Sequence, residues 1–312
     1  DLIKQSLSQW FEKIYNHTFL NSIINETSLR EIIIHSYISY QVNGENLSFD
    51  EQISEEDYQL CLETIAHKQS QSWNYMNPFS SFFATLNGQT FRVTLSHFSL
   101  TPNKCSKAFI RKIAHHKFSI SDFVQEESQL ELFQYLIKEK KNILLAGETG
   151  SGKTTLLSSF LSYMPKSEHL VIIEDTHELV STNQNHSFLL ASKQENKSLK
   201  AYCSYALRMS PDRMILGEMR GAEVVPFVMA MNNGHKGLMS TIHASSGKDT
   251  LTRLALLFSL YSDTNSVSFT QILTLICQNI DYVVHLKARK VNEVIKVLGS
   301  EDEVPFYETL IS

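Results

Sequence analysis

The sequence has no long apolar run. Nothing in its 312 residues approaches the ~18 consecutive apolar residues that a membrane-spanning helix requires. Internal repeats and low-complexity stretches are also missing, and 42% of the residues are hydrophobic against 20% that are charged. This composition is typical of globular domains that fold in water, and the length predicts two of them.

Cysteine is scarce and scattered. The four cysteines show none of the paired spacings of a zinc site or a disulfide framework, so we expect a reducing, cytoplasmic environment for Cys61, Cys105, Cys203 and Cys277. The net charge of −5 argues against a general nucleic-acid-binding function, because such binding depends on basic patches. We therefore expect no direct nucleic-acid partner.

Glycine is also scarce, and it is concentrated in two places. Of the 11 glycines, three lie between positions 147 and 152 and four between 217 and 237. Glycine is unfavourable inside helices and strands, but it is useful where the backbone turns sharply or approaches a ligand closely. The two clusters therefore mark a candidate ligand site.

The first glycine cluster forms a phosphate-binding loop. Residues 147–154 read Gly-Glu-Thr-Gly-Ser-Gly-Lys-Thr and fill every fixed position of that pattern. The apolar stretch 142–146 predicts a buried strand before the loop, and 155–163 predicts a helix after it. This order directs backbone N–H groups and a helix N-terminus at a phosphate.

Within this loop Lys153 is expected to contact the outer phosphates, and the Thr154 hydroxyl to bind Mg²⁺. The full set of expected nucleotide-binding residues is Gly147, Glu148, Thr149, Gly150, Ser151, Gly152, Lys153, Thr154 and Thr155.

The first part of the chain is predicted to be a small α+β domain over residues 1–117. The pairs Asn43-Gly44 and Asn87-Gly88 each separate strand-like segments, and Asn-Gly tolerates the positive φ of a tight hairpin turn. Between them we expect a helix that begins at Ser54, with a cap that involves Asp57. In the last strand of this region Arg92 alternates with apolar residues and should face away from the core.

A polar stretch, 118–128, is expected to link this domain to a second domain over residues 129–312. The second part alternates strands and helices, which predicts an α/β fold with a mostly parallel sheet. After the glycine loop, the expected strands are 169–174, 213–218, 238–242, 281–286 and 293–298.

Acidic residues follow the predicted strand 169–174. In open α/β sheets the ligand lies beyond the carboxyl ends of the strands, and Asp175 and Glu178 fall at such an end. Their carboxylates can bind the hydration shell of Mg²⁺ or position water, which makes Asp175 a candidate metal ligand. The alternative is a solvated turn before a helix N-terminus, where acids are favoured without any ligand.

Glu218 ends the predicted strand 213–218, where phosphate-loop domains usually carry a magnesium-binding Asp. Gly217 precedes it, so we expect the metal role to move to Asp175 and Glu218 to orient or deprotonate the attacking water. The alternative is a salt bridge to Arg220 or Arg213.

Two histidines flank the predicted strand 238–242. His235 precedes this strand and His243 follows it, so they are too far apart to share one metal ion, but each is a candidate for sensing a γ-phosphate. Phosphoryl transfer also needs positive charge near the transition state, often from an arginine. Spacing alone leaves five candidates open: Arg92, Arg111, Arg208, Arg213 and Arg220.

Four blocks in this order resemble the hexameric ATPases of type II and type IV secretion and pilus assembly. They are the glycine loop (Walker A), an acidic box at 172–179, a Walker B block at 207–223 and a histidine box at 234–244. Upstream, 91–93 and 109–112 resemble the two arginine-bearing strands of that family's N-terminal domain. The nearest branches are the conjugation-type (Vir-type) and the tight-adherence pilus (CpaF-like) ATPases.

The resemblance implies an N-terminal domain followed by a RecA-like ATPase domain, with ATP and Mg²⁺ as cofactors and six subunits in a ring. It implies that Arg92 and Arg111 contact the phosphates, that Glu218 is the catalytic base and that His243 responds to the γ-phosphate. Hydrolysis would rock the N-terminal domain and power secretion or pilus assembly, with platform proteins at the cytoplasmic face of the inner membrane as partners. Two other functions stay open: an ATP-gated docking ring with little turnover, and a RecA-like nucleic-acid motor.

Overall fold

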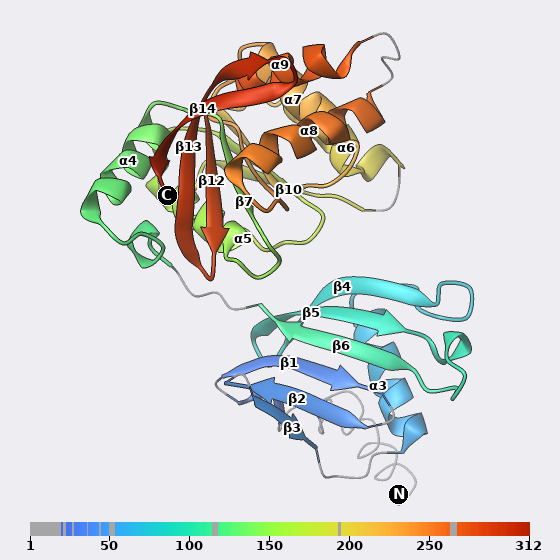
Figure 1. The fold of residues 1–312 in the computed structure, drawn as a ribbon. Helices are drawn as coiled ribbons and strands as arrows, with labels where there is room; N and C mark the ends of the chain where they lie inside the picture. The colour runs from blue at the N-terminus through green and yellow to red at the C-terminus, as the bar shows by residue number, and fades with distance from the viewer. Residues whose placement is uncertain are drawn as a thin grey trace, which may run out of the picture. The chain divides into compact units, whose positions relative to one another are not determined.

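The structure is a computed structural model that describes residues 20, 23–26, 28–35, 37–43, 45–49, 54–113, 118–192, 195–262 and 267–312. The chain forms two compact units, Asp1–His115 and His116–Ser312, and each has its own sheet and its own hydrophobic core (Figure 1). No helix within the described ranges is long and apolar enough to cross a membrane.

The first unit contains a 6-stranded antiparallel sheet in the order β3-β2-β1-β6-β5-β4. Among the residues that the structure describes, the helix α3 packs on one face of this sheet. The elements are β1 (Leu29–Ile34), β2 (Ile38–Val42), β3 (Glu45–Ser48), α3 (Glu55–Lys68), β4 (Phe79–Leu86), β5 (Gln89–Ser96), η1 (Phe98–Leu100) and β6 (Lys107–Lys112).

The turn and helix-cap residues of this unit adopt the predicted conformations. Asn87 and Gly88 adopt φ values of +48° and +74° in the turn between β4 and β5, which confirms the second hairpin. Asn43 also has a positive φ after β2, while Gly44 lies outside the described residues. The Ser54 hydroxyl accepts a hydrogen bond from the backbone N–H of Asp57 at 3.1 Å, so α3 begins where the cap predicts.

The two faces of this sheet differ. Phe91, Val93 and Leu95 of β5 point into the core that α3 covers. Arg92 alternates with them, and its strand register sets it directly opposite Arg111 of β6. The face away from α3 therefore carries two neighbouring arginines.

The second unit contains an 8-stranded sheet in the order β14-β13-β12-β7-β11-β10-β8-β9. The six strands from β12 to β9 are parallel, and β13 and β14 add an antiparallel edge. The strands are β7 (Ile143–Gly147), β8 (Leu170–Glu174), β9 (His186–Leu190), β10 (Arg213–Met219), β11 (Met239–Ile242), β12 (Tyr282–Lys287), β13 (Lys290–Glu301) and β14 (Val304–Ile311).

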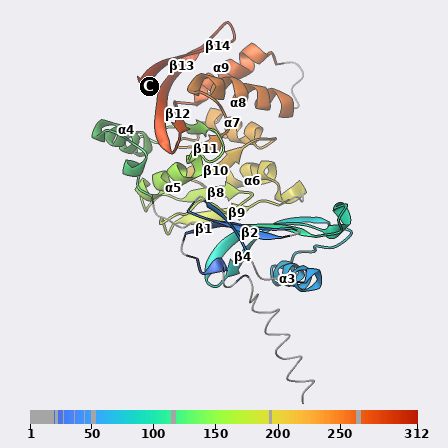
Figure 2. The ribbon, with the colours of Figure 1, turned by 60° about the horizontal axis from the view of Figure 1, so that its bottom comes forward.

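Helices flank this sheet on both sides (Figures 1 and 2). On one face α4 and α5 pack against the sheet, and on the other α6, α7, α8 and α9 do so. The bounds are η2 (Ile120–Asp122), α4 (Glu127–Lys138), α5 (Lys153–Tyr163), η3 (Glu195–Lys197), α6 (Leu199–Ala206), α7 (Val224–Asn232), α8 (Gly247–Tyr261) and α9 (Phe269–Asn279). The predicted α/β class with a mostly parallel sheet is confirmed.

Part of the stretch expected to be a linker packs into the second unit. Ile120, Phe123 and Val124 are buried in the same core as α4 and α5. In the sequence these three apolar residues lie among polar neighbours, so the average polarity of the stretch predicted a linker. Residues 114–117, just before the expected linker, lie outside the described residues.

Arg213 is a buried charge at the amino end of β10. Its Nε donates to Glu168 Oε2 at 2.5 Å, and its Nη2 donates to the carbonyl oxygen of Ile137 at 2.7 Å. Lys140 lies 3.2 Å from the other oxygen of Glu168. The guanidinium thus joins α4 and the turn before β8 to the start of β10, and its loss leaves each of these acceptors with one donor fewer.

Replacing Arg213 with Met should lower the free energy of unfolding by about 3 kcal/mol, because it removes one partner of a buried ion pair. Urea unfolding followed by circular dichroism measures this change. The double variant Arg213→Met/Glu168→Leu should recover most of the loss, since an apolar pair of similar volume can replace a buried ion pair. A single variant as stable as wild type would contradict the assignment.

Candidate nucleotide-binding site

The phosphate loop joins β7 to α5 through three glycines with positive φ. Gly147 has φ +145°, Gly150 has φ +78°, and Gly152, the N-cap of α5, has φ +97°. A Cβ on Gly147 would lie 2.5 Å from the carbonyl oxygen of Leu286 and 2.6 Å from Ser151 Oγ. Only glycine fits there, because any Cβ would collide with these two oxygens.

Lys153 is the first residue of α5 and is buried. Its Nζ donates to the carbonyl oxygens of Gly147 at 2.9 Å and Glu148 at 2.8 Å. An ammonium carries three donors, and the remaining side of this one faces His243 Nδ1 at 3.5 Å. Burial lowers the pKa of Lys153, while the charge of Glu218 raises it.

A chain of polar side chains continues from His243. Its Nε2 lies 2.8 Å from Glu218 Oε1, and the other oxygen of Glu218 lies 3.8 Å from Arg220 Nη1. Arg220 also forms an ion pair with Asp175 through Nη2. A neutral imidazole that donates from Nε2 to Glu218 presents Nδ1 as an acceptor toward Lys153, so charge and hydrogen-bond polarity agree along the chain.

The strand register explains why these residues meet. Ala146 pairs with Ile242, and Ile173 pairs with Leu216, so the carboxyl ends of β7, β11, β10 and β8 share one edge of the sheet. The register between β10 and β11 shifts between Leu216 and Met219 and adds a residue to β10. Such bulges re-aim side chains next to functional sites, and this one contains Glu218.

Gly217 and Glu174 support this bulge. The Thr241 hydroxyl donates to the carbonyl oxygen of Gly217 at 2.7 Å, and a Cβ on Gly217 would lie 3.0 Å from Glu174 Cγ. Glu174 is buried, and its Oε1 accepts from the backbone N–H groups of Glu178 and Leu179, both at 3.0 Å. Glu174 therefore shapes the acidic loop rather than facing a ligand.

The same carboxylate acts on His177, whose Nδ1 lies 3.2 Å from Glu174 Oε2. This hydrogen bond raises the pKa of His177, against the opposing effect of burial. Among the acids of this loop, Asp175 belongs to the polar chain through Arg220, whereas the side chain of Glu178 is exposed.

Several candidates from the sequence are not brought to this edge. His235 precedes β11, so it lies at the amino edge of the sheet, at the other end of the strand from His243. Arg208 and Arg213 precede or begin β10 and lie at the same amino edge. Arg92 and Arg111 belong to the first unit, where they pair across β5 and β6.

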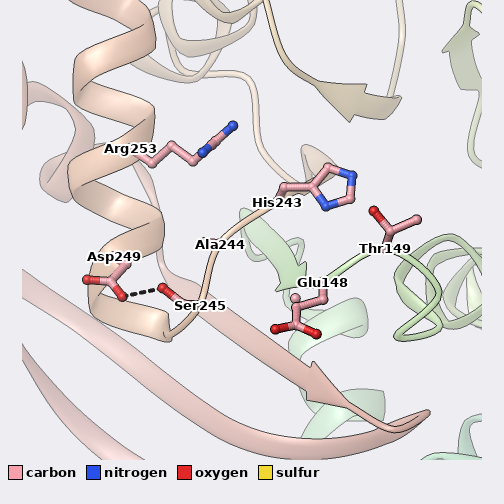
Figure 3. Close-up of a pocket in the computed structure, with 8 residues that line it drawn as sticks. Glu148, Thr149, His243, Ala244, Ser245, Asp249 and Arg253 are labelled. Carbon is pink, nitrogen blue, oxygen red and sulfur yellow. Dashed lines mark hydrogen bonds between the residues drawn. The ribbon is translucent and has the colours of Figure 1, made fainter.

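Two residues at the loop edge were missed in the sequence. Glu223 is buried, and its Oε1 accepts from the backbone N–H groups of Arg220 and Gly221, both at 2.7 Å, which fixes the loop after β10. Arg253 of α8 lines a pocket of about 450 Å³ beside the phosphate loop (Figure 3). The position of Glu223 just after Gly221 was a possible signal for it. For Arg253 the sequence gives only helical periodicity, which places it on the outer face of the helix.

The residues of the loop fit a phosphate. The Ser151 hydroxyl is buried without a hydrogen-bond partner, and the glycine cradle would be filled by any Cβ at Gly147. No three His, Cys, Asp or Glu side chains of the described ranges form a metal-binding group. Mg²⁺ usually keeps several waters and takes one or two carboxylates plus substrate phosphates, and Thr154 and Asp175 suit that kind of site.

Comparison with known proteins identifies the family. The family model described as type II/IV secretion system protein matches residues 78–297. The chain belongs to this family. It is 27% identical over 263 residues to the type IV secretion system protein VirB11 of Bartonella quintana, which covers 82% of this chain and 74% of that protein.

The chain is also similar to three other proteins. The chain is 35% identical over 169 residues to the type IV secretion system protein PtlH of Bordetella pertussis, about half of each chain (51% and 49%). Its fold matches the pilus retraction motor PilT with bound ADP, with a TM-score of 0.66, 19% identity and coverage of 94% and 81%. It also matches the Legionella pneumophila ATPase DotB, with a TM-score of 0.65, 17% identity and coverage of 95% and 79%. At these identities the two structures establish a shared fold, which confirms the predicted architecture.

Proposed function

We propose that this secretion-family protein is an ATPase that hydrolyses Mg-ATP at the phosphate loop of its second unit. The observation that supports it most is the polar chain that starts at Lys153 in the loop and passes through His243 to Glu218. A phosphate-binding cation and a carboxylate able to act on water therefore lie at one sheet edge. Hydrolysis of a phosphoanhydride needs these two functions together.

In this mechanism the loop amides and Lys153 bind the outer phosphates. The side of the Lys153 ammonium that faces His243 is the side from which it can donate to a phosphate oxygen. Glu218, held by His243 and Arg220, orients the attacking water and accepts its proton. Thr154 and Asp175 would hold Mg²⁺, which would supply positive charge against the phosphates. His243 touches both Lys153 and Glu218, so it can respond to a γ-phosphate between them.

Arg92 and Arg111 are proposed to bind phosphate from the first unit. Like charges directly opposite on neighbouring strands destabilise a sheet, and these two arginines face each other on β5 and β6. Glu31 of β1, opposite Arg111 on its other side, offsets part of this repulsion. A bound anion would add negative charge beside this pair, and an arginine fork suits phosphate oxygens.

At the level of the cell we propose a homo-hexamer that powers type II/IV secretion or pilus assembly. Binding and hydrolysis would rock the first unit against the second, peripherally at the cytoplasmic face of the inner membrane and in contact with platform proteins. Membership of the secretion family and the names of the relatives VirB11 and PtlH support this proposal.

Turnover of purified protein with Mg-ATP tests the enzymatic proposal. Glu218→Gln should lower kcat by about 10²–10⁴ while nucleotide still binds, because only the base is lost. Lys153→Ala should abolish both binding and turnover. Glu131→Gln, which changes an exposed carboxylate of α4 in the same way, should leave the rate unchanged. Equal rates in wild type, Glu218→Gln and Lys153→Ala would rule the ATPase out and favour a docking ring.

Ring assembly is measured by multi-angle light scattering with and without a non-hydrolysable ATP analogue. We expect the mass of six chains in the presence of the analogue, since the resemblance to the secretion ATPases implies six subunits in a ring. A strictly monomeric protein at tens of micromolar, with or without the analogue, would contradict the ring.

Stimulation of turnover by DNA that falls steeply with salt would instead indicate a nucleic-acid motor.

A further inference from the structure

Arg253 projects from α8 into the pocket beside the phosphate loop (Figure 3). The opposite wall is formed by Gly147, Glu148 and Thr149, the first residues of the loop, and by His243. His243 is the residue that bonds to Glu218 and faces Lys153. The guanidinium therefore lies on the side of the loop where the terminal phosphate and the attacking water are proposed to meet.

Asp249 does not neutralise Arg253, although it lies one turn earlier on the same helix. Its Oδ2 accepts a hydrogen bond from the Ser245 hydroxyl at 2.7 Å. Hydrogen bonds from Ser245 and Ser246 hold the pKa of Asp249 below its usual value, so it stays ionised and satisfied within the helix cap. The other acid on the pocket wall is Glu148, a residue of the loop itself.

The helix that carries Arg253 is fixed to the sheet. The backbone N–H of Gly247, the first residue of α8, donates to Glu293 Oε2 of β13 at 2.6 Å, and a Cβ there would lie 2.9 Å from the same oxygen. Leu251, Leu254 and Ala255 bury the inner face of the helix in the core. The helix backbone at Arg253 is thereby fixed, and the exposed side chain of Arg253 lines the pocket.

We propose that Arg253 donates hydrogen bonds to the terminal phosphate of ATP and lets the site distinguish a triphosphate from a diphosphate. This inference rests on the proposed ATPase function. A planar guanidinium suits two oxygens of one phosphate. Arg253 lines the pocket together with the start of the loop and not with α5, where the inner phosphates would lie. Arg253 would thus supply positive charge from the same unit as the loop, separately from Arg92 and Arg111.

Fluorescence titration with a non-hydrolysable mant-ATP analogue and with mant-ADP tests this proposal. Arg253→Gln should raise the Kd for the triphosphate at least about 10-fold, because a charge-assisted hydrogen bond is lost. The Kd for mant-ADP should change by less than about 2-fold. Arg253→Lys should fall between Gln and wild type, since it keeps the charge but not the fork.

Arg208→Gln is the matched control, because it removes the same charge from an exposed residue that precedes β10, at the amino edge of the sheet. It should leave both affinities unchanged. Equal weakening of both nucleotides by Arg253→Gln, or no weakening of either while Lys153→Ala loses both, would overturn the role of Arg253 and leave the ATPase proposal intact. A wild-type protein that binds neither nucleotide would overturn both.

Discussion

The parallel pairing of β7, β11, β10 and β8 is the constraint on which the site depends. Their common direction puts four strand ends at one edge, so residues 90 positions apart in sequence, Lys153 and His243, come within 3.5 Å. A shift of one residue in any of these pairings would turn the following polar side chain to the other face of the sheet. The strands β7 and β8 are buried on both faces, because helices cover both sides of the sheet.

Around this edge, buried acids bind backbone rather than ligand. Glu174 holds the loop after β8, and Glu223 holds the loop after β10. Both carboxylates accept hydrogen bonds from backbone N–H groups of these loops, which would otherwise need another partner. Asp175, Glu218 and Arg220 are thereby left on fixed supports but partly open to solvent, which is the state that a water-activating site needs.

Much of this arrangement could be predicted from local sequence signals. The glycine loop, the Asn87-Gly88 turn and the Ser54 cap each depend on a few adjacent residues, and the structure has all three. The expected strands appear within a few residues of their predicted bounds, whereas β9 and β14 were not expected. Both are edge strands whose pairing comes from one neighbour only, and their short or polar sequences carry little periodicity.

The roles of individual side chains at the site were harder to predict, because they depend on contacts between distant segments. Asp175 and Glu178 were both expected at the site, yet Asp175 joins the polar chain through Arg220 whereas Glu178 is exposed. The salt bridge considered as an alternative for Glu218 does exist with Arg220, but Glu218 also bonds to His243. No sequence motif marks Arg253, and it lies beside the phosphate loop only because α8 packs there.

We expect nucleotide to bind at the loop and to change the polar side chains that connect the loop to β10. Hydrogen–deuterium exchange with and without a non-hydrolysable Mg-ATP analogue tests it most directly. We expect slower exchange at residues 148–154 together with residues 217–223 and 243–245. Unchanged exchange in the loop at a saturating analogue concentration, or protection confined to a different part of the chain, would contradict the account.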